Sequence, residues 1–331
     1  MKKLINDPYQ VTIESIEGFV AAFPKHIRRV GRQAVARVDA PISGKVGVLI
    51  GGGSGHEPLF MGYVGKGFAD ACPVGNIFAS PSPEIVLDAT RAASGGAGVL
   101  YLYGNYSGDV MNFDMAAEEA AEEGIEVKTV RVTDDVASAP KDEIERRRGI
   151  AGDFFVFKAA GARAEMGGSL EQVCAAATKA NENTRSMGVA LTSCTIPASG
   201  KPIFQLADDE IEIGLGIHGE PGQSRTKWIP ADRVTEQLIA RVVEDLPFRS
   251  GDEVAVLVNG LGATPLAEIY IVYRRAAQLL QEAGVRVYRS WVGEYSTSLE
   301  MAGASVTLLR LDDELKALVD YPADCPCFTQ V

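Results

Sequence analysis

Histidine, cysteine and tryptophan are scarce in this sequence. Its 331 residues include three histidines, five cysteines and two tryptophans. An odd number of scattered cysteines does not form the paired pattern of a disulfide-stabilised protein, so we expect most of them to stay as thiols. The chain has no apolar run near the ~18 residues that a membrane span requires, and residues 1–7 break off before the apolar core of a signal peptide. We therefore expect a cytoplasmic protein.

Positive charge is also in short supply. The chain has 32 lysines and arginines against 44 aspartates and glutamates, which gives a formal net charge of −12. Such a charge repels phosphate backbones and anionic lipids, so neither nucleic acid nor a membrane surface is an expected partner. Hydrophobic residues make up 46% and charged residues 23% of the chain. These ordinary values exclude a disordered or fibrous protein, and the length favours two domains.

Short runs of β-branched residues alternate with helical patterns along the whole chain. This alternation predicts two α/β domains with largely parallel or mixed sheets. We place the boundary near residue 185, with the glycine-rich loop and Asp109 in an N-terminal domain at 1–185 and His218 in a C-terminal domain at 186–331. The expected strands are 45–50, 98–103, 127–132, 187–193, 210–218, 254–259, 285–291 and 305–311. The expected helices are 109–123, 169–183, 265–282 and a last one from 312.

Glycine is abundant, with 35 residues, and it gathers where predicted strands end. Residues 51–58 read GGGSGHEP, and such glycines let the backbone approach a phosphate or a hydroxylated small molecule. No Lys-Ser or Lys-Thr pair follows, which excludes a P-loop, and His-Glu-Pro fits a dinucleotide fingerprint poorly. A tight turn in which His56 caps a neighbour is the simpler alternative. A serine hydrolase using Ser54 is an alternative from another class, although His56 replaces the last glycine of its Gly-x-Ser-x-Gly motif.

Asp109 and His218 also follow predicted strands. Asp109 precedes a predicted helix, where an aspartate ordinarily serves as the N-cap. A catalytic base is its other candidate role, although N–H bonds to the carboxylate would weaken that base. In the strand predicted at 210–218 the apolar residues share one face, and His218 lies on the open face between glycines, which favours a functional role. His26 lies in a basic segment and is expected to be structural or solvated.

The histidines do not form a recognisable metal-binding motif. His56 and His218 with Glu57 or Glu220 would supply ligands, but no spacing of the His-Glu-x-x-His kind supports such a site. The Cys-Pro-Cys sequence at 325–327 has a one-residue gap and no second cysteine pair. We therefore predict no metal ligands in this chain.

Six segments together are far more specific than any single loop. They are GGGSGHEP at 51–58, ACP at 71–73, FASPSP at 78–83, GNYSGD at 104–109, GIHGEPG at 216–222 and NGLGATP at 259–265. In this order and at these spacings, the chain closely resembles the dihydroxyacetone kinase family, and within it the substrate-binding subunit. The resemblance spans most of the chain.

The resemblance implies a covalent mechanism of substrate binding. In the family, the histidine matching His218 attacks the ketone carbon of the substrate and forms a hemiaminal. The residues matching His56 and Asp109 contact substrate hydroxyls with acid/base roles, and the backbone around Gly53 lines the pocket. A neutral imidazole can add to a ketone but not to glycerol, so the covalent bond selects ketoses. The substrate-binding residues so implied are Gly53, Ser54, Gly55, His56, Asp109 and His218.

The chain departs from the family pattern in two respects. Gly104 stands where the family often has lysine, which leaves room for a tetrulose such as erythrulose. The 331 residues contain no helical nucleotide-binding domain of the kind that complete kinases of the family carry. The resemblance therefore implies no cofactor on this chain, with ATP or bound ADP plus Mg²⁺ on a separate partner subunit. The choice between free ATP and a phosphotransfer protein as donor stays open.

The leading interpretation is thus a ketose kinase subunit, and the resemblance implies a homodimer. A ketose-binding sensor without turnover is the rival from another functional class. The presence of Asp109 together with His218 favours the enzyme, because a sensor would need only the covalent anchor.

Overall fold

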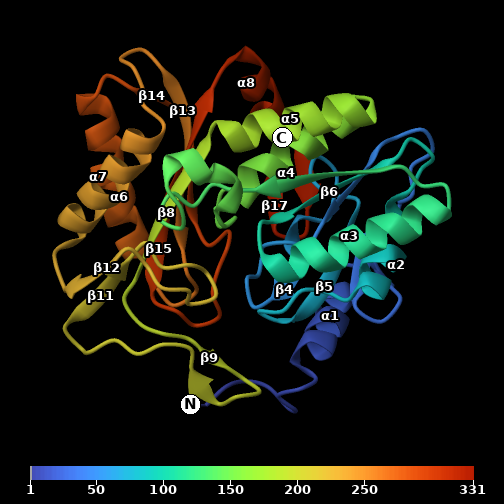
Figure 1. The fold of residues 1–331 in the computed structure, drawn as a ribbon, viewed down its shortest axis with the longest axis horizontal. Coiled ribbons are helices and arrows are strands. Elements are labelled where there is room, and N and C mark those ends of the chain that lie inside the picture. The colour runs from blue at the N-terminus through green and yellow to red at the C-terminus, as the bar shows by residue number, and fades with distance from the viewer. Residues whose placement is uncertain (1) are drawn as a thin grey trace. The chain divides into compact units, whose positions relative to one another are not determined.

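The computed structural model describes residues 2–331 and divides into two compact units. Unit 1 comprises the chain up to Val132 together with Phe155–Ala180 and Leu315–Val331, and unit 2 comprises Thr133–Phe154 and Asn181–Glu314. Each unit has its own large sheet with helices packed on it (Figure 1). The predicted α/β class with mixed sheets is confirmed.

The single domain boundary near residue 185 stays a prediction. The compact units are drawn differently, because residues 133–154 belong to unit 2 and residues 315–331 return to unit 1. Such a return of the C-terminal segment has no signal in local sequence patterns.

Unit 1 contains a seven-stranded sheet in the order β1-β2-β5-β3-β6-β7, with β4 paired to β5. Strands β5, β3, β6 and β7 are parallel, whereas β1 and β2 form an antiparallel edge. Every residue of β3 and β6 is buried, as is typical of parallel strands in the middle of a sheet. The strands are β1 (Ile27–Val30), β2 (Ala34–Arg37), β3 (Gly47–Ile50), β4 (Gly52–Ser54), β5 (Ala71–Ile77), β6 (Val99–Gly104) and β7 (Val127–Val132).

Helices α2 (Pro83–Ala93) and α3 (Ser107–Glu122) pack side by side in unit 1 (Figure 1). Proline at the first position of α2 suits a helix start, because the N–H that it lacks would have no partner within the helix. Small and aromatic residues of both helices, such as Ala89 and Phe113, join Tyr101 of β6 in the core. The other elements lying mainly in unit 1 are α1 (Val11–Ala22), η1 (Met61–Tyr63), α4 (Asp153–Glu165), α5 (Leu170–Glu182), α8 (Asp313–Asp320), β16 (Ala323–Cys325) and β17 (Phe328–Gln330).

Unit 2 contains a six-stranded sheet in the order β12-β11-β8-β15-β13-β14. Within the described residues, β13 and β14 are its one parallel pair, and the other neighbours are antiparallel. Its strands are β8 (Thr184–Ala190), β11 (Glu210–Ile213), β12 (Ser224–Lys227), β13 (Glu253–Gly260), β14 (Arg286–Gly293) and β15 (Gly303–Leu311). The remaining elements of the unit are η2 (Lys141–Arg146), β9 (Thr195–Ile196), β10 (Lys201–Pro202), α6 (Ala231–Asp245) and α7 (Leu266–Glu282).

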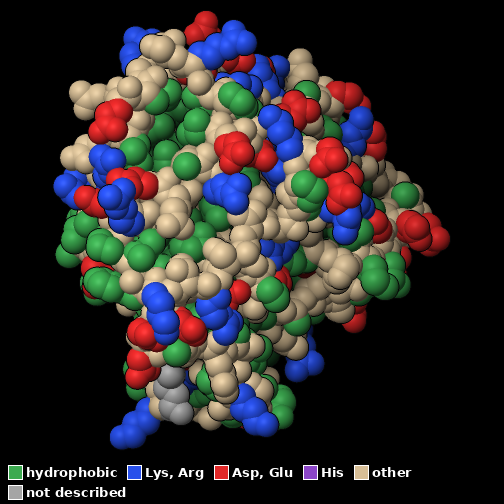
Figure 2. Space-filling model, turned by 60° about the vertical axis from the view of Figure 1, so that its left-hand side comes forward, with side chains coloured by type: hydrophobic (Ala, Val, Ile, Leu, Met, Phe, Trp, Pro, Cys, Tyr) green, Lys and Arg blue, Asp and Glu red, His purple; other side chains and the backbone are tan. Residues whose placement is uncertain are grey.

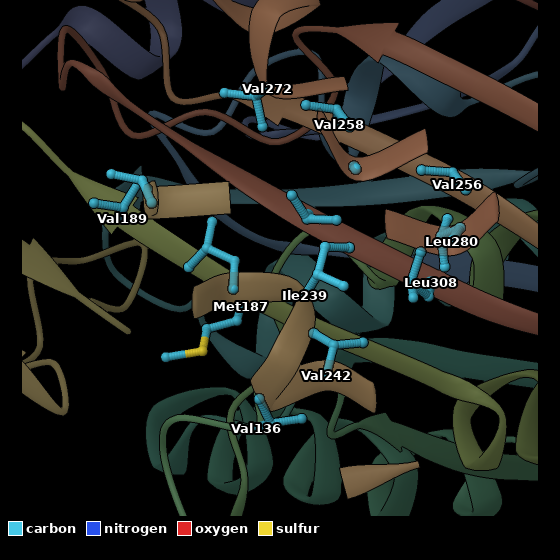
Figure 3. Close-up of a cluster of buried hydrophobic side chains, with 14 of the residues drawn as sticks. Val136, Met187, Val189, Ile239, Val242, Val256, Val258, Val272, Leu280 and Leu308 are labelled. Atoms are coloured by element: carbon cyan, nitrogen blue, oxygen red, sulfur yellow. The ribbon is translucent and has the colours of Figure 1, made fainter. Parts of the chain in front are cut away.

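The core of unit 2 forms where α6 and α7 pack on this sheet (Figure 3). Val256 and Val258 of β13 point to the same face because strand side chains alternate. They join Leu308 of β15 and, from α6, Ile239 and Val242 in one buried cluster. β-branched residues favour strands that bury one face under helices, which is why the sequence predicts the strands of this unit.

One sequence prediction about an element near the site is wrong, and another differs from the structure only in where a helix begins. The strand predicted at 210–218 ends at Ile213, because Gly214 has a φ of +80° that extended backbone does not allow. The helix predicted at 109–123 is found as α3, which begins slightly earlier, at Ser107. The helix α4 was not predicted, since nearly all of its residues are buried and no one-sided apolar pattern marks it.

Among residues 2–331, no helix is long and apolar enough to cross a membrane. On the face drawn in Figure 2, acidic and basic side chains lie next to one another. The described residues form surface ion pairs, such as Lys227 with Asp209 at 2.7 Å. All five cysteines are free thiols, in agreement with the sequence prediction.

Candidate active site

In unit 1, the glycine-rich loop and the segment before Asp109 follow neighbouring parallel strands. Ile50 of β3 lies opposite Leu102 of β6, and the N–H of Gly51 donates to the carbonyl oxygen of Leu102 at 3.3 Å. Both segments therefore leave the sheet at the same edge. The carboxyl edge of parallel strands is where doubly wound sheets bind ligands.

The imidazole of His56 is buried, with 1% of the residue exposed. Its ring stacks on that of Phe78, with centroids 4.8 Å apart, and meets the ring of Phe60 edge-on at 6.5 Å. Both phenylalanines have positive φ, 55° and 69°, a conformation that such residues rarely adopt. Strained backbone of this kind often occurs at functional sites. Two aromatic contacts thus fix the plane of the His56 ring.

Gly53 lies against the segment that follows β5. A Cβ at this position would lie 2.7 Å from the backbone nitrogen of Ala79, so only glycine fits without displacing that segment. The hydroxyl of Ser54 donates to the carbonyl oxygen of Gly75 at 2.9 Å and shares a hydrogen bond of 2.8 Å with the hydroxyl of Thr12. The Ser54 side chain therefore ties α1 to β5.

The next residues of the loop are held by the partly buried carboxylate of Glu57. The N–H of Gly55 donates to Oε2 of Glu57 at 2.9 Å and to Oε1 at 3.2 Å. Burial raises the pKa of Glu57, although the backbone hydrogen bonds oppose the shift. This contact joins the residues directly before and after His56 and so fixes the local backbone.

Asp109 is the third residue of α3 and is 8% exposed. The prediction that it is the N-cap is wrong, because Tyr106 holds that position and makes no side-chain capping bond. Asp109 instead lies in the first turn, where the helix dipole favours a negative charge. In the next turn, Asn112 donates from its amide to the carbonyl oxygen of Pro81 at 2.8 Å, which joins α3 to the loop that follows β5. Burial raises the pKa of the nearby Tyr103 to about 12. The negative charges of Asp114 and Asp109 add to this shift, and a hydrogen bond to Arg131 opposes it.

His218 lies in unit 2, in a turn after β11 and not on the strand that the sequence predicted. The N–H of Gly219 donates to the carbonyl oxygen of Gly216 at 3.0 Å, and the N–H of Gly216 donates to that of Glu220 at 3.1 Å. The hydroxyl of Ser298 holds the turn from behind by donating to the carbonyl oxygen of Ile217 at 2.5 Å. The His218 side chain is 21% exposed.

A carboxylate two residues along contacts this histidine twice. Oε1 of Glu220 lies 3.0 Å from Nδ1 of His218, and Oε2 accepts the backbone N–H of His218 at 3.0 Å. Burial opposes ionisation of Glu220, but the hydrogen bond and charge of His218 and the charge of Arg148 outweigh it and lower its pKa to about 2. Glu220 is therefore a carboxylate at neutral pH.

Behind Glu220 lies a buried ion pair. Arg148 donates from Nε to Oδ2 of Asp135 at 3.0 Å, and its Nη1 lies 3.9 Å from Oε2 of Glu220. Burial raises the pKa of Asp135 to about 6, against the opposing charge of Arg148. Sequence reasoning missed Arg148 and Asp135, since they lie more than 60 residues before His218 and no motif marks them. It considered Glu220 only as a metal ligand, and the described residues contain no cluster of three metal-ligating groups.

The comparisons with known proteins decide the family. Residues 17–327 match the model of the Dak1 domain. The chain belongs to the dihydroxyacetone kinase family. It is 52% identical over 330 residues to the dihydroxyacetone-binding subunit of PTS-dependent dihydroxyacetone kinase 2 from Listeria innocua, and the match covers 99% of both chains. It is 45% identical to the D-erythrulose kinase of Mycolicibacterium smegmatis, covering 99% of this chain and 56% of that protein.

Solved structures of the dihydroxyacetone kinase family share the fold. The dihydroxyacetone kinase of C. freundii, solved in complex with AMP-PNP and Mg²⁺, matches with a TM-score of 0.89 and 33% identity, over 99% of this chain and 61% of that one. A dihydroxyacetone kinase operon co-activator matches with a TM-score of 0.90 and 30% identity, over 96% of this chain and 98% of that one. The family predicted from the six segments is confirmed, and its members include both kinases and a regulator.

Proposed function

We propose that this chain is the substrate-binding subunit of a dihydroxyacetone kinase. It holds a short-chain ketose as a hemiaminal on His218 while a separate subunit supplies the nucleotide. The observation that carries the proposal is the match along 99% of both chains to a dihydroxyacetone-binding subunit at 52% identity. A match over the whole length of a separate binding subunit favours the same division of labour here.

The surroundings of His218 support its role as the nucleophile. Nδ1 faces the Glu220 carboxylate, which leaves Nε2 as the nitrogen that adds to a ketone carbon. Glycerol has no electrophilic carbon, so the same pocket discriminates against it without excluding it by size. The residual exposure of the side chain allows the ring to meet a small molecule.

Asp109 and His56 are proposed to act on the hydroxyl that receives the phosphoryl group. Phosphoryl transfer needs little beyond placement of that hydroxyl, removal of its proton and neutralisation of charge at the donor. Asp109 is proposed as the base that takes the proton, with His56 as the second acid/base group. Mg²⁺ and the nucleotide would supply the charge neutralisation from the partner subunit.

A regulatory protein that binds a ketose without turnover is the second candidate. The operon co-activator supports it, since that protein shares the fold at a TM-score of 0.90. Its identity of 30% is well below the 52% shared with the binding subunit, which favours the enzyme. Buried Asp109 favours it too, because a sensor has no proton to remove.

The ketose is proposed to be dihydroxyacetone, with erythrulose as the alternative. Gly104 closes β6 directly before the Asp109 segment, and a lysine there would add a cation beside the substrate. The D-erythrulose kinase match at 45% identity supports the larger substrate. The variant Gly104→Lys is expected to lower the preference for erythrulose over dihydroxyacetone, measured as the ratio of the two kcat/KM values.

The decisive experiment has two stages. Intact mass under gentle ionisation, with each ketose or with glycerol, is expected to show a gain of one whole ketose without loss of water and no gain with glycerol. The second stage measures ketose phosphorylation with ATP and Mg²⁺, with and without the remaining subunits of the Listeria innocua kinase. A further arm supplies phosphoenolpyruvate and phosphotransfer proteins to identify the donor.

Each part of the proposal is contradicted by a different experimental result. Turnover by the chain alone contradicts the separate nucleotide subunit. Adduct formation with no turnover under any donor favours the sensor. The proposal also includes a cytoplasmic location and a homodimer, the latter carried over from the family, and light scattering in solution tests the dimer.

A further inference from the structure

The side chain of Glu220 contacts both the ring and the backbone of His218. Its Oε1 faces Nδ1 at 3.0 Å, and its Oε2 accepts the backbone N–H at 3.0 Å. An ionised carboxylate has only acceptors to offer, so a neutral imidazole facing it must carry its proton on Nδ1. The lone pair is then on Nε2, and the ring cannot turn over without losing the contact.

A largely buried arginine faces Glu220 on the side away from His218. Arg148 lies 3.9 Å from Oε2 of Glu220 and is held by Asp135 at 2.8 Å, and the side chains of Arg148 and Asp135 are 13% and 1% exposed. The charges of Asp135, Arg148 and Glu220 therefore alternate, and the last of them faces the neutral imidazole of His218. Such support is what keeps a reactive side chain within a narrow range of orientations.

Gly216 leaves the space in which this contact forms. A Cβ built at Gly216 would collide with Oε2 of Glu220 and lie 2.6 Å from Nη1 of Arg148. A Cβ in this place would displace the carboxylate, the guanidinium or both, so Gly216 keeps open the space in which the contact forms.

We propose that Glu220 is a positioning residue that holds His218 as the Nδ1–H tautomer, with the nucleophilic lone pair on Nε2, and that the charge of Arg148 orients Glu220 for this purpose. The proposal deepens the proposed function and rests on His218 being the nucleophile. Glu220 acts only through His218. It is the counterpart of the carboxylate that orients the histidine of a catalytic triad.

The addition step balances as follows. The Nε2 lone pair forms the C–N bond, the π pair of the ketone moves to its oxygen, and that oxygen takes one proton from solvent. The ring then carries one positive charge, with Nδ1 still protonated opposite the Glu220 carboxylate. Loss of the Nδ1 proton to solvent then gives the neutral hemiaminal, restores the proton balance and ends the hydrogen bond between Nδ1 and Glu220. A fixed negative charge at Nδ1 stabilises the charged stage of this step.

The variant Glu220→Gln tests the tautomer directly. A glutamine amide has one acceptor and one donor group, so it cannot accept from both N–H groups of His218 through separate oxygens. If its oxygen keeps the backbone N–H, its NH2 group faces Nδ1 and selects the opposite tautomer, in which Nε2 is protonated and has no lone pair to donate.

The matched control is Glu212→Gln. Glu212 supports the other end of the same loop: its Oε1 accepts the N–H of Gly222 at 2.8 Å, and its Oε2 accepts from Arg225 at 2.8 Å. A glutamine oxygen can keep the loop bond, while the 46% exposed Arg225 side chain can turn into solvent. The two measurements are the ¹⁵N spectrum of histidine-labelled protein and the rate of ketose adduct formation by intact mass. With only three histidines in the chain, the His218 signals are those that vanish in His218→Ala.

Wild-type protein and Glu212→Gln are expected to show a protonated Nδ1 and an unprotonated Nε2 at His218. Glu220→Gln is expected to shift the ring to the Nε2–H form and to slow adduct formation strongly, toward the roughly 10⁴-fold loss that the wrong histidine tautomer causes in a catalytic triad. Gly216→Ala, which places a methyl group against Oε2 of Glu220 and Nη1 of Arg148, is expected to move both measurements in the same direction.

Three results would overturn the proposal. An unchanged tautomer in Glu220→Gln would do so, whatever happens to the rate, since Glu220 would then only support the turn. An equal loss of adduct rate in Glu212→Gln would show the same. A normal adduct rate with the altered tautomer would remove the link to reactivity. If wild-type protein forms no adduct, the proposed function fails, while the tautomer shift still reports whether Glu220 orients the ring.

Discussion

Replacing Asp109 by asparagine separates a charge at a helix end from a catalytic base. Asp109 is the third residue of α3, so its loss of charge removes an interaction with the helix dipole worth about 0.3–1 kcal/mol. Asparagine keeps the volume of the side chain, and the N-cap position belongs to Tyr106. The free energy of unfolding is therefore expected to fall by at most about 1 kcal/mol.

The effect on turnover is expected to be much larger. Without the carboxylate, no proton acceptor remains at this position, and phosphorylation should slow by roughly 10²–10⁴-fold. Ketose capture should survive, because that step uses the His218 imidazole. Urea unfolding, intact mass with ketose, and a kinase assay with the partner subunits measure the three quantities separately.

The matched control is Asp114→Asn on the same helix. Asp114 is half exposed and pairs with Arg131 at 3.1 Å, so its loss is expected to cost less than about 1 kcal/mol and to leave turnover unchanged. Wild-type turnover by Asp109→Asn would refute the reasoning, since Asp109 would then only stabilise the helix. His56 would be the next candidate for the base.

His218→Ala is expected to abolish the ketose adduct while the unfolding transition stays cooperative, because this side chain lies in a turn and not in the core; a surviving adduct in the mass spectrum would move the nucleophile elsewhere. Glu220 has a pKa of about 2 against an ordinary 4.5, so its contribution to stability is present above pH 4.5 and is lost as the pH falls toward 2. At 1.36 kcal/mol per tenfold change in proton affinity this is about 3 kcal/mol at most, and less for a side chain that is 30% exposed. Urea unfolding of Glu220→Gln between pH 4.5 and 2 should therefore depend less on pH than that of the wild type, and equal slopes would contradict this.

The fold was predictable where local pattern and tertiary packing agree. The strand predicted at 127–132 is found as β7 with the same bounds, and the long helix predicted at 265–282 is α7 within one residue. In both, β-branched or one-sided apolar patterns coincide with the face that is buried. The α4 helix shows the opposite case, because a helix buried on all sides has no polar face to reveal its period.

The sequence predicts which residues form the candidate site but not which side chains contact them. Glycine-flanked strand ends pointed to His56, Asp109 and His218, and the structure places the first two in segments that follow parallel strands of one sheet. The aromatic rings around His56 and the Arg148 ion pair have no local signature, because each contact joins residues far apart in the chain.

In the segment 216–222, the glycines correctly mark the position of the site, but the pattern around them predicts the wrong secondary structure. Strict alternation of apolar residues up to Ile217 predicts a strand, yet the positive φ of Gly214 turns the chain away after Ile213. The alternation therefore records burial of single side chains and not a continued strand. The turn lets the Glu220 side chain contact His218, two residues earlier in the chain. A strand would not allow this contact, because in a strand the side chains at i and i+2 project in parallel from one face. In the turn, the Glu220 carboxylate folds back onto the ring and N–H of His218. Aspartate, one methylene shorter, would have to give up one of the two contacts, so the length of the glutamate is as much a part of the motif as its charge.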